Sequence, residues 1–425
     1  MASRYRPDVV NVLAELRPAS ESNKEAVAYE IALEGASQVI GFYAELIARE
    51  EAAGEPNTDA ITRWRAEQQA WAARRRELTP QDTQEIAAIH SEGEDLLASD
   101  EEQEEGPTTH RTAAVHAATE QRMHGFEESE SERIFRDRIV PDELTGTPQD
   151  HPVVVIVAGQ PGDGKATITA LAQGVLNRRG RPVTISPDRY EPHHPSFRAL
   201  ITDKPTTAGR YLSMDGRRWM AKAASYVRSQ RFDVVMESVL LDPGDFEQPA
   251  RQFKAAGYQV EVAIVAAHEA FSRFGVLDRH IRALEAYGYG RLADPGLHDV
   301  CYQGVLRAAE AIDREEFADR VAVLRPDAQL IYGNQRTVDG RWQQPARTAD
   351  AISWERGRPS TVSESRLFLD AVSALERIGL TAPIPWIRHE AVEGARTVTA
   401  LARPRLHPDA VTLHIATAGV SPPDA

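Results

Sequence analysis

The chain has 425 residues, more than one ordinary hydrophobic core holds, so two or three domains are expected. Its formal net charge of −15 argues against a nucleic-acid partner, which demands a basic face, and against an anionic membrane surface. The single cysteine, Cys301, rules out a disulfide framework, and the start of the chain has no apolar signal region, so we expect a cytoplasmic protein without a membrane span.

The first predicted elements are helices within residues 20–98. Residues 99–107 form a charged run that ends in Gly-Pro, which is typical of a solvated linker. We therefore assign residues 1–98 to a helical N-terminal domain and residues 99–109 to an acidic linker. Three apolar stripes at helical spacing predict a small bundle: Val39, Phe42, Tyr43, Leu46 and Ile47; Ile61, Trp64 and Trp71; Ile86, Ile89, Leu96 and Leu97.

A short apolar run at residues 153–158 is rich in β-branched residues, which predicts a buried strand. It leads into the phosphate-binding pattern G-x-x-x-x-G-K, in which small residues let backbone N–H groups surround phosphate oxygens at a helix N-terminus. Lys165 is expected to reach the β- and γ-phosphates of a nucleoside triphosphate. The predicted nucleotide-binding residues are Gly159, Gln160, Pro161, Gly162, Asp163, Gly164, Lys165, Ala166 and Thr167.

The residue after Lys165 departs from this pattern, which has Ser or Thr there to ligate Mg²⁺. Here the residue is Ala166, and Thr167 lies about 100° further round the helix, facing elsewhere. Either water and substrate phosphates hold the Mg²⁺, or catalysis is weakened. The sequence leaves both interpretations open and predicts no protein ligand to the metal.

Strands and helices alternate after the loop. Further strands are expected at residues 182–186, 233–237, 260–266 and 329–332, with a helix over 214–229. This alternation predicts an α/β fold: a P-loop kinase-like, mostly parallel sheet with helices on both faces, preceded by the all-α N-terminal domain. We assign residues 110–345 to this domain and 346–425 to a C-terminal helical and irregular extension, in which Phe368, Val372 and Leu375 indicate one helix.

Ligands in such a fold bind beyond the carboxyl ends of the strands, where the sequence places acids. Asp188 follows the second strand, where it could accept a proton from an acceptor hydroxyl or simply open a turn. Glu237 ends the third strand. Arg279 and Arg291 could neutralise charge at a γ-phosphate or lie solvated on a helix, and His194, beside a proline, is by itself a turn residue.

Taken together, these residues resemble the zeta-toxin family of P-loop kinases over about residues 130–335. The loop has that family's Gln-Pro, and Asp188 and His194 match its D-x-[FY]-x-x-x-H-P pattern. Glu237 stands at the family's E-G-T position, and Arg279 and Arg291 match its arginine pair. No single motif is decisive, but their order and spacing are specific.

The resemblance implies a toxin that uses ATP and Mg²⁺ to phosphorylate a hydroxyl of UDP-N-acetylglucosamine. Three departures put the acceptor in doubt: Ala166; Ser238-Val239 in place of Gly-Thr; and Ala221, where some members carry a substrate-binding Glu. Two alternatives therefore stay open: a kinase of another small molecule, and a degenerate nucleotide-binding regulatory module. The implied roles are phosphate binding for Lys165, general base for Asp188, phosphoryl stabilisation for Arg279 and Arg291, and substrate binding for Glu237 and His194, with Glu237 positioning sugar nucleotide or metal.

The resemblance also bears on the helical segment 20–98. Zeta-type kinases are typically restrained by a small helical antitoxin that covers the nucleotide site. A bundle fused in the same chain could do this in cis at high effective concentration, or it could be an unrelated interaction or assembly domain. A separate antitoxin chain is the other partner that the resemblance implies.

Overall fold

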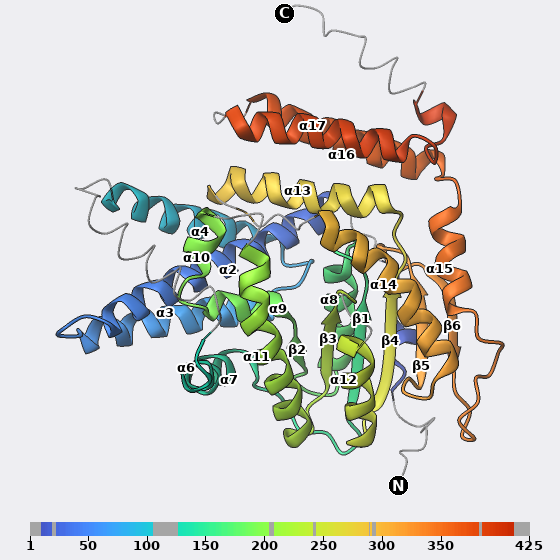
Figure 1. Ribbon diagram of the computed structural model, residues 1–425, viewed down its shortest axis with the longest axis horizontal. Coiled ribbons are helices and arrows are strands. Elements are labelled where there is room, and N and C mark those ends of the chain that lie inside the picture. The colour runs from blue at the N-terminus through green and yellow to red at the C-terminus, as the bar shows by residue number, and fades with distance from the viewer. Residues whose placement is uncertain are drawn as a thin grey trace, which may run out of the picture.

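A six-stranded sheet forms the centre of the molecule (Figure 1). The computed structural model describes residues 10–18, 23–104, 126–203, 208–240, 244–288, 290, 295–381 and 385–411. The sheet has the order β2-β3-β1-β4-β5-β6; all neighbours are parallel except β5 and β6, which are antiparallel. The strands are β1 (Val153–Ala158), β2 (Val183–Ile185), β3 (Val234–Ser238), β4 (Gln259–Val265), β5 (Arg320–Leu324) and β6 (Leu330–Gln335).

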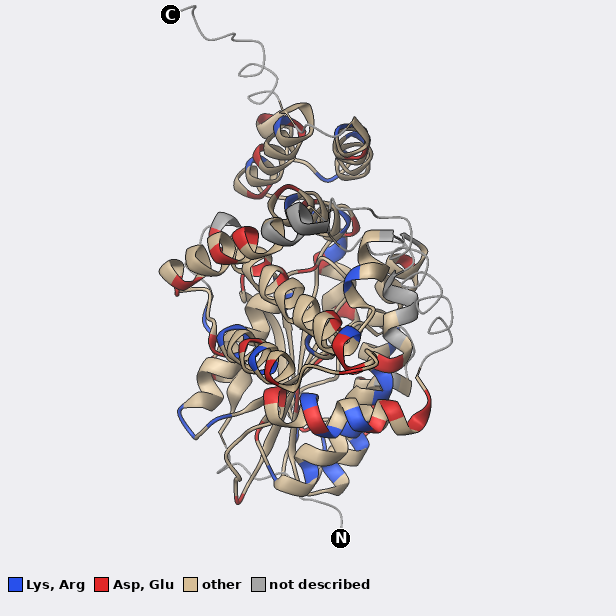
Figure 2. Ribbon diagram, turned by 90° about the vertical axis from the view of Figure 1, so that its left-hand side faces the viewer, with Lys and Arg blue, Asp and Glu red and all other residues tan. Residues whose placement is uncertain are grey.

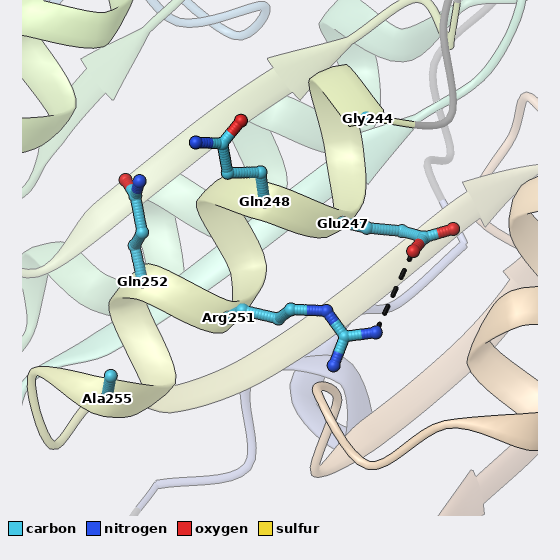
Figure 3. Close-up of a pocket in the computed structure, with 6 residues that line it drawn as sticks. All are labelled: Gly244, Glu247, Gln248, Arg251, Gln252 and Ala255. Atoms are coloured by element: carbon cyan, nitrogen blue, oxygen red, sulfur yellow. Dashed lines mark ion pairs between the residues drawn. The ribbon is translucent and has the colours of Figure 1, made fainter.

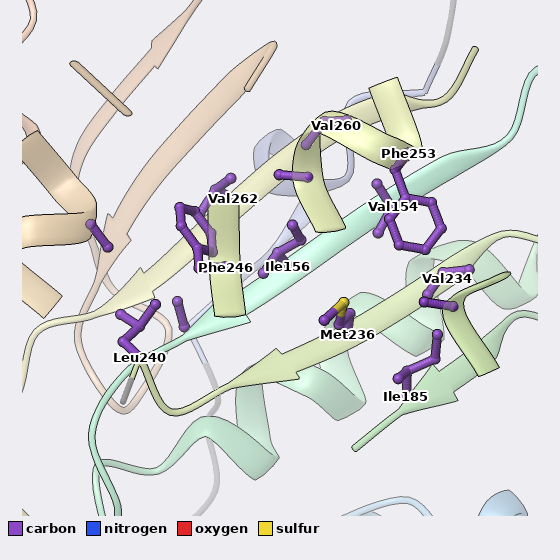
Figure 4. Packing of buried hydrophobic residues seen from close by; sticks show 14 of the residues in the cluster. Val154, Ile156, Ile185, Val234, Met236, Leu240, Phe246, Phe253, Val260 and Val262 are labelled. Carbon is purple, nitrogen blue, oxygen red and sulfur yellow. The ribbon is translucent and has the colours of Figure 1, made fainter. Parts of the chain in front are cut away.

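The central strands are apolar because both of their faces are covered. Every residue of β1 is buried, so its sequence reads as a continuous run rather than an alternation. Val154 and Ile156 face one core with Phe246 and Phe253 (Figure 4), whereas Val153, Val155 and Val157 face the opposite core. The predicted α/β class with helices on both faces is confirmed.

Helices from the two halves of the chain form these two outer layers. One core packs residues of the helices at 208–230, 244–255 and 295–314, and the other packs the helix after β1 with a short N-terminal turn. The helices between the strands are α8 (Lys165–Asn177), α9 (Pro187–Tyr190), the 3-10 turn η2 (Glu191–His193), α10 (Phe197–Asp203), α11 (Ala208–Gln230), α12 (Gly244–Ala255), α13 (Glu269–Tyr287) and α14 (Pro295–Arg314).

The N-terminal helices pack on the sheet domain. Helix α1 (Val12–Glu15) lies in the core between α8 and the sheet, and α2 (Asn23–Glu51), α3 (Thr58–Glu77) and α4 (Thr83–Glu104) form the predicted helical bundle. The bundle's buried cluster includes Phe197 and Tyr287 of the kinase-like part. A short lead-in to β1 comprises α6 (Glu128–Ile134), the π-helix η1 (Phe135–Ile139) and α7 (Val140–Glu143).

Two sequence-based boundaries change in the structure. Helix α4 continues to Glu104, so the first part of the predicted linker is helical, and residues 105–109 lie outside the described residues. Residues 12–16 belong to the core beneath the sheet rather than to a separate N-terminal domain, because Val12, Leu13 and Leu16 pack against β1 residues. The N-terminal and kinase-like parts therefore share their cores.

One helix among the described residues is long and apolar enough to cross a membrane. It is the Glu25–Glu51 part of α2, and 78% of its most apolar window is buried inside the protein. The sequence had led us to expect no run of that length. Burial on this scale is what a core helix requires, because its apolar surface is already covered by protein.

The C-terminal extension is helical. Helix α15 (Thr348–Gly357) packs against α14, β5 and β6, and α16 (Val362–Thr381) and α17 (Pro385–Ala402) form a hairpin. The hairpin lies on α13, opposite to the sheet (Figure 2). Phe368, Val372 and Leu375, the residues that predicted a helix, lie in α16 and are buried against α13 and α17.

Candidate functional site

The phosphate-binding pattern forms a tight loop between β1 and α8, at the carboxyl edge of the sheet. Gly162 has φ +76°, and a Cβ there would lie 2.1 Å from the carbonyl oxygen of Ser272. Gly164 has φ +86° and directly precedes α8, so the loop turns straight into the N-terminus of that helix. Only glycine adopts this backbone at no steric cost, which explains the spacing of the motif.

Lys165 is folded back into the loop. Its Nζ donates to the carbonyl oxygens of Gly159 at 3.0 Å and Gln160 at 2.7 Å, and it pairs with Asp163 Oδ1 at 2.9 Å. Asp163 is 2% exposed, and burial raises the pKa of its carboxyl while Lys165 opposes the rise. The ammonium is therefore held where a phosphate could exchange with these acceptors.

Glu237 joins three elements at this edge. Its Oε1 accepts from the hydroxyl of Thr169 on α8 at 2.7 Å, and its Oε2 accepts from the hydroxyl of Ser186 after β2 at 2.9 Å. Ser186 lies two residues before Asp188 and Thr169 one helical turn after Lys165. The ends of β1, β2 and β3 are thus tied together, although sequence reasoning had not identified Thr169 or Ser186.

Asp188 lies in the first turn of α9 and its side chain is exposed. The backbone around it is held from the N-terminal bundle: Arg75 of α3 donates to the carbonyl oxygens of Asp188 at 3.3 Å and Arg189 at 2.8 Å. Because β1 and β2 run parallel, Asp188 and Lys165 follow strands that end at the same edge of the sheet. The kinase prediction requires Lys165 and Asp188 to lie at the same edge of the sheet, and the strands that precede them both end there.

Of the two predicted arginines, the structure describes only Arg279. Arg279 lies on α13 and is partly buried. Burial raises the pKa of Glu30 on α2, and the charge of Arg279 opposes that rise. Arg291 lies outside the described residues, so its role stays a prediction. Helix α13 packs against the phosphate loop, since a Cβ at Gly275 would lie 2.4 Å from the carbonyl oxygen of Gly162, and Arg279 lies one turn further along that helix. Its role in phosphoryl transfer stays a prediction.

His194 is buried away from solvent. It is 2% exposed, its ring lies 4.5 Å from that of Phe126, its Nδ1 accepts the backbone N–H of Ser196 at 3.0 Å, and its Nε2 lies 3.8 Å from Asp215. These contacts orient the turn after η2 and do not present the ring to a ligand. The substrate-binding role of His194 stays a prediction.

The residues that depart from the family pattern lie in different surroundings. Ala166 packs beside the apolar cluster that α2 shares with α10 and α13. Thr167 is 7% exposed, and Val239 is partly buried after β3. Ala221 lies on the exposed side of α11. The exposure of Ala221 places that position at the surface rather than in a closed substrate site.

Helix α2 of the N-terminal bundle crosses the region beside the loop. Tyr29 is 3% exposed, and burial raises the pKa of its hydroxyl, with the charges of Arg189 and Glu237 also acting on it. The next residue, Glu30, has its pKa raised by burial, against the opposing charges of Arg279 and Lys165. Two polar side chains of the bundle therefore lie among the predicted site residues.

The helix is fitted closely against the kinase-like part. The hydroxyl of Tyr287 on α13 donates to the carbonyl oxygen of Ile31 at 3.3 Å. A Cβ at Gly35 would lie 2.2 Å from that hydroxyl, so only glycine allows this approach. On its other side α2 contacts α10 and η2, beyond β2.

A surface hollow of about 430 Å³ lies along α12 (Figure 3). All of its lining residues belong to α12, and Arg251 pairs with Glu247, one turn earlier on the same helix, at 3.7 Å. None of the predicted site residues lines it. The hollow is therefore not the candidate nucleotide site.

Comparisons with known proteins agree on the central part of the chain. A family model described as zeta toxin matches residues 137–337. Toxin PezT of Streptococcus pneumoniae serotype 4 (strain ATCC BAA-334 / TIGR4) is 21% identical over 209 residues, which cover 46% of this chain and 81% of PezT.

Solved structures with a similar fold include one from the PezAT chromosomal toxin-antitoxin system of the human pathogen Streptococcus pneumoniae. It aligns with a TM-score of 0.50 and 17% identity, covering 60% of this chain and 98% of that chain. A chain of the AvrRxo1-ORF1:AvrRxo1-ORF2 complex aligns with a TM-score of 0.36 and 12% identity, covering 68% and 84% of the two chains. At these identities the first likeness supports the fold alone.

Proposed function

This chain belongs to the zeta-toxin family of kinase-like proteins through residues 137–337, and from that premise we propose that it transfers the γ-phosphoryl group of ATP to a hydroxyl of a sugar nucleotide, UDP-N-acetylglucosamine. The observation that carries the proposal is the tie made by Glu237. Through Thr169 and Ser186 it joins the phosphate loop to the segment that holds Asp188. A phosphate-binding ammonium and a candidate base thereby follow strands that end at one edge of the sheet.

The proposed reaction uses each of these groups in one role. Lys165 exchanges its loop carbonyls for phosphate oxygens, and Asp188 takes the proton of the acceptor hydroxyl. The acceptor oxygen then forms its bond to the γ-phosphorus while the bond to the β–γ bridging oxygen breaks, so ADP leaves. Arg279 neutralises charge on the phosphoryl oxygens in transfer, because an arginine stays ionised and donates several hydrogen bonds.

The residues at this edge fit Mg²⁺ bound mainly through water and phosphate. The described residues hold no group of three or more His, Cys, Asp or Glu that could bind a metal. Glu237, Thr169 and Ser186 nevertheless gather a carboxylate and two hydroxyls, the hard oxygen donors that Mg²⁺ and its bound waters prefer. When bound, the metal would neutralise charge on the β- and γ-phosphates.

The test is phosphoryl transfer by the full chain with ATP, Mg²⁺ and UDP-N-acetylglucosamine, read by mass spectrometry. One added phosphoryl group is expected on the sugar nucleotide. Asp188→Asn should lower the rate about 100-fold or more, because general-base catalysis contributes at least that much. Asp150→Asn, at an exposed carboxylate before β1, is the matched control and should leave the rate unchanged.

Two other outcomes would favour the alternatives, which are a kinase of another small molecule and a degenerate nucleotide-binding regulatory module. Turnover of ATP only with a different hydroxyl acceptor would replace the sugar nucleotide by another small molecule. For a degenerate module, Ala166→Thr is informative: a tenfold rise in turnover means that about 1.4 kcal/mol of barrier was missing. Folded chain that binds ATP but phosphorylates no acceptor, with or without Ala166→Thr and also when Glu30→Gln is introduced into α2, would overturn the kinase proposal.

We further propose that the bundle restrains this site in cis, in the role that an antitoxin partner has in a toxin-antitoxin system. Support comes from α2, whose apolar cluster includes Ala166, the residue after Lys165, and whose Tyr29 and Glu30 have pKa values on which the charges of Arg189, Glu237, Arg279 and Lys165 act. A carboxylate beside the loop's ammonium competes with phosphate for the same positive charge. The PezAT system is described as a toxin-antitoxin system, and a restraint acting on this fold is consistent with that description.

A further inference from the structure

One arginine outside the matched family region reaches the phosphate loop. Arg356 lies on α15, beyond residue 337, and is 6% exposed. Its Nη2 donates to Gln160 Oε1 at 2.9 Å and its Nη1 donates to the carbonyl oxygen of Tyr302 at 2.8 Å. The guanidinium also lies 3.7 Å from the centroid of the Tyr302 ring, which fixes its plane.

Gln160 is the second residue of the loop and is completely buried. Its side-chain amide is used at both ends: Oε1 accepts from Arg356, and Nε2 donates to the carbonyl oxygen of Ala267 after β4 at 3.1 Å. Its main-chain oxygen accepts from Lys165 at 2.7 Å. Gln160 thus connects the phosphate-binding lysine to the sheet and to α15.

The charge of Arg356 also acts on the loop. Burial raises the pKa of Asp163, the carboxyl that pairs with Lys165, and the charges of Lys165 and Arg356 both oppose that rise. A buried guanidinium is costly unless its donors are paired. Here Nη1 and Nη2 are paired with a backbone carbonyl and a loop amide, whereas Nε has no hydrogen-bond partner and the guanidinium lies over the Tyr302 ring. The arrangement places positive charge behind the loop and fixes the side chain of Gln160.

We propose that Arg356 is a positioning residue for nucleotide binding: through Gln160 it holds the loop in the conformation that receives phosphate, so α15 belongs to the kinase unit. This inference rests on the proposed nucleotide chemistry of the site. It predicts that a change in the C-terminal extension alters nucleotide affinity without any contact between Arg356 and the acceptor sugar.

The test compares Arg356→Met and Arg356→Lys with a matched control in the full chain. The control is Arg336→Met, because Arg336 is also a buried arginine, 5% exposed and 4.2 Å from the Trp342 ring, that donates to backbone carbonyls far from the loop. Amide hydrogen exchange of residues 158–166 and the Kd for ATP are measured for each variant. Both readouts are independent of the identity of the acceptor.

Arg356→Met should speed exchange of the loop amides about tenfold and weaken ATP binding about tenfold or more, since a hydrogen bond to a charged donor is lost. Arg356→Lys keeps the charge, so it should retain part of the loop's amide protection and part of the ATP affinity. In turnover, the KM for ATP should rise while kcat changes little.

The outcomes separate the inference from the proposed function. Unchanged loop exchange in Arg356→Met, or an equal change in Arg336→Met, overturns the positioning role. Faster loop exchange in Arg356→Met alone supports the positioning role even if no chain binds ATP, in which case the proposed function fails instead. A double variant with Gln160→Ala should be no worse than Gln160→Ala alone, because Gln160→Ala already removes the contact with Arg356.

Discussion

At the scale of single residues, Asp233 has an unusual carboxyl. It precedes β3, is 2% exposed, accepts the backbone N–H of Val153 at 2.7 Å and lies 3.5 Å from Arg179. Burial raises its pKa from 3.8 to about 6, against the opposing effects of Val153 and Arg179. Between these two pH values the folded chain holds a proton that the unfolded chain has released.

Stability should therefore fall as the pH rises from about 4 to about 6, because the folded state binds more protons over that window. The shift of about two units corresponds to at most about 3 kcal/mol in the free energy of unfolding. Asp233→Asn keeps an acceptor for Val153 and does not ionise, so its stability relative to wild type should be greater at pH 7.5 than at pH 4. Urea unfolding at both pH values measures this, and a pH-independent difference would show that Asp233 ionises normally.

The site residues differ in how far the sequence could predict them. Lys165 and its glycines follow from a motif whose backbone demands are local, and Glu237 follows from its place at a strand end. Ser186 and Arg356 carry no such signal, because their partners are brought to them only by the tertiary fold. Thr169 could have been noticed as the hydroxyl one helical turn beyond Ala166, on the same face of α8.

At the scale of elements, a buried ion pair joins the bundle to the kinase-like part. Arg75 of α3 is 2% exposed and contacts Glu143 of α7 at 2.7 Å. Burial disfavours the ionised form of Glu143, but Arg75, His193 and Arg189 outweigh it and lower its pKa to about 2. The pair holds α3 against the segment of Asp188.

Arg75→Met should cost about 3–5 kcal/mol, because it leaves the charge of Glu143 buried without its main partner. The neighbouring Arg74 pairs with Glu85 and Glu92 at the surface, so Arg74→Met should cost no more than about 1 kcal/mol. Denaturant unfolding of the two variants compares these costs. Equal, small losses would mean that Glu143 is neutral or solvated in the folded chain.

Another buried ion pair explains why the sequence pattern did not predict strand β5. Glu261 of β4 and Arg320 of β5 lie opposite each other in register and pair at 2.5 Å. Glu261 also accepts the backbone N–H of Leu13 at 3.0 Å, which attaches α1 beneath the sheet. A charged residue at the start of β5 leaves only a short apolar run, 321–324, so propensity alone does not indicate a strand there.

At the scale of the whole molecule, the bundle and the kinase-like part cannot be treated as separable units. Phe197, Leu200 and Tyr287 are buried by α2 and its neighbours, and Val12, Leu13 and Leu16 fill the core on the other side of the sheet. A chain shortened to begin near residue 108 would expose both sets. Release of the proposed restraint is therefore better tested by point changes in the full chain.

Glu30→Gln is that change, because it removes the carboxylate that lies near Lys165 and Arg279 while keeping the shape of the side chain. We expect ATP to bind about tenfold more tightly, since loss of one competing charge beside a phosphate site is worth on the order of 1–2 kcal/mol. Glu45→Gln is the control: Glu45 lies on the same helix, paired with Arg49 at 2.8 Å.

Calorimetric titration of ATP into the two variants and the wild type measures the effect, and growth on expression reports toxicity. Tighter binding and slower growth only in Glu30→Gln mean that α2 competes with the nucleotide. Equal affinity in all three chains means that the bundle is a structural or assembly element, since a helix that covers the site must compete with whatever binds there.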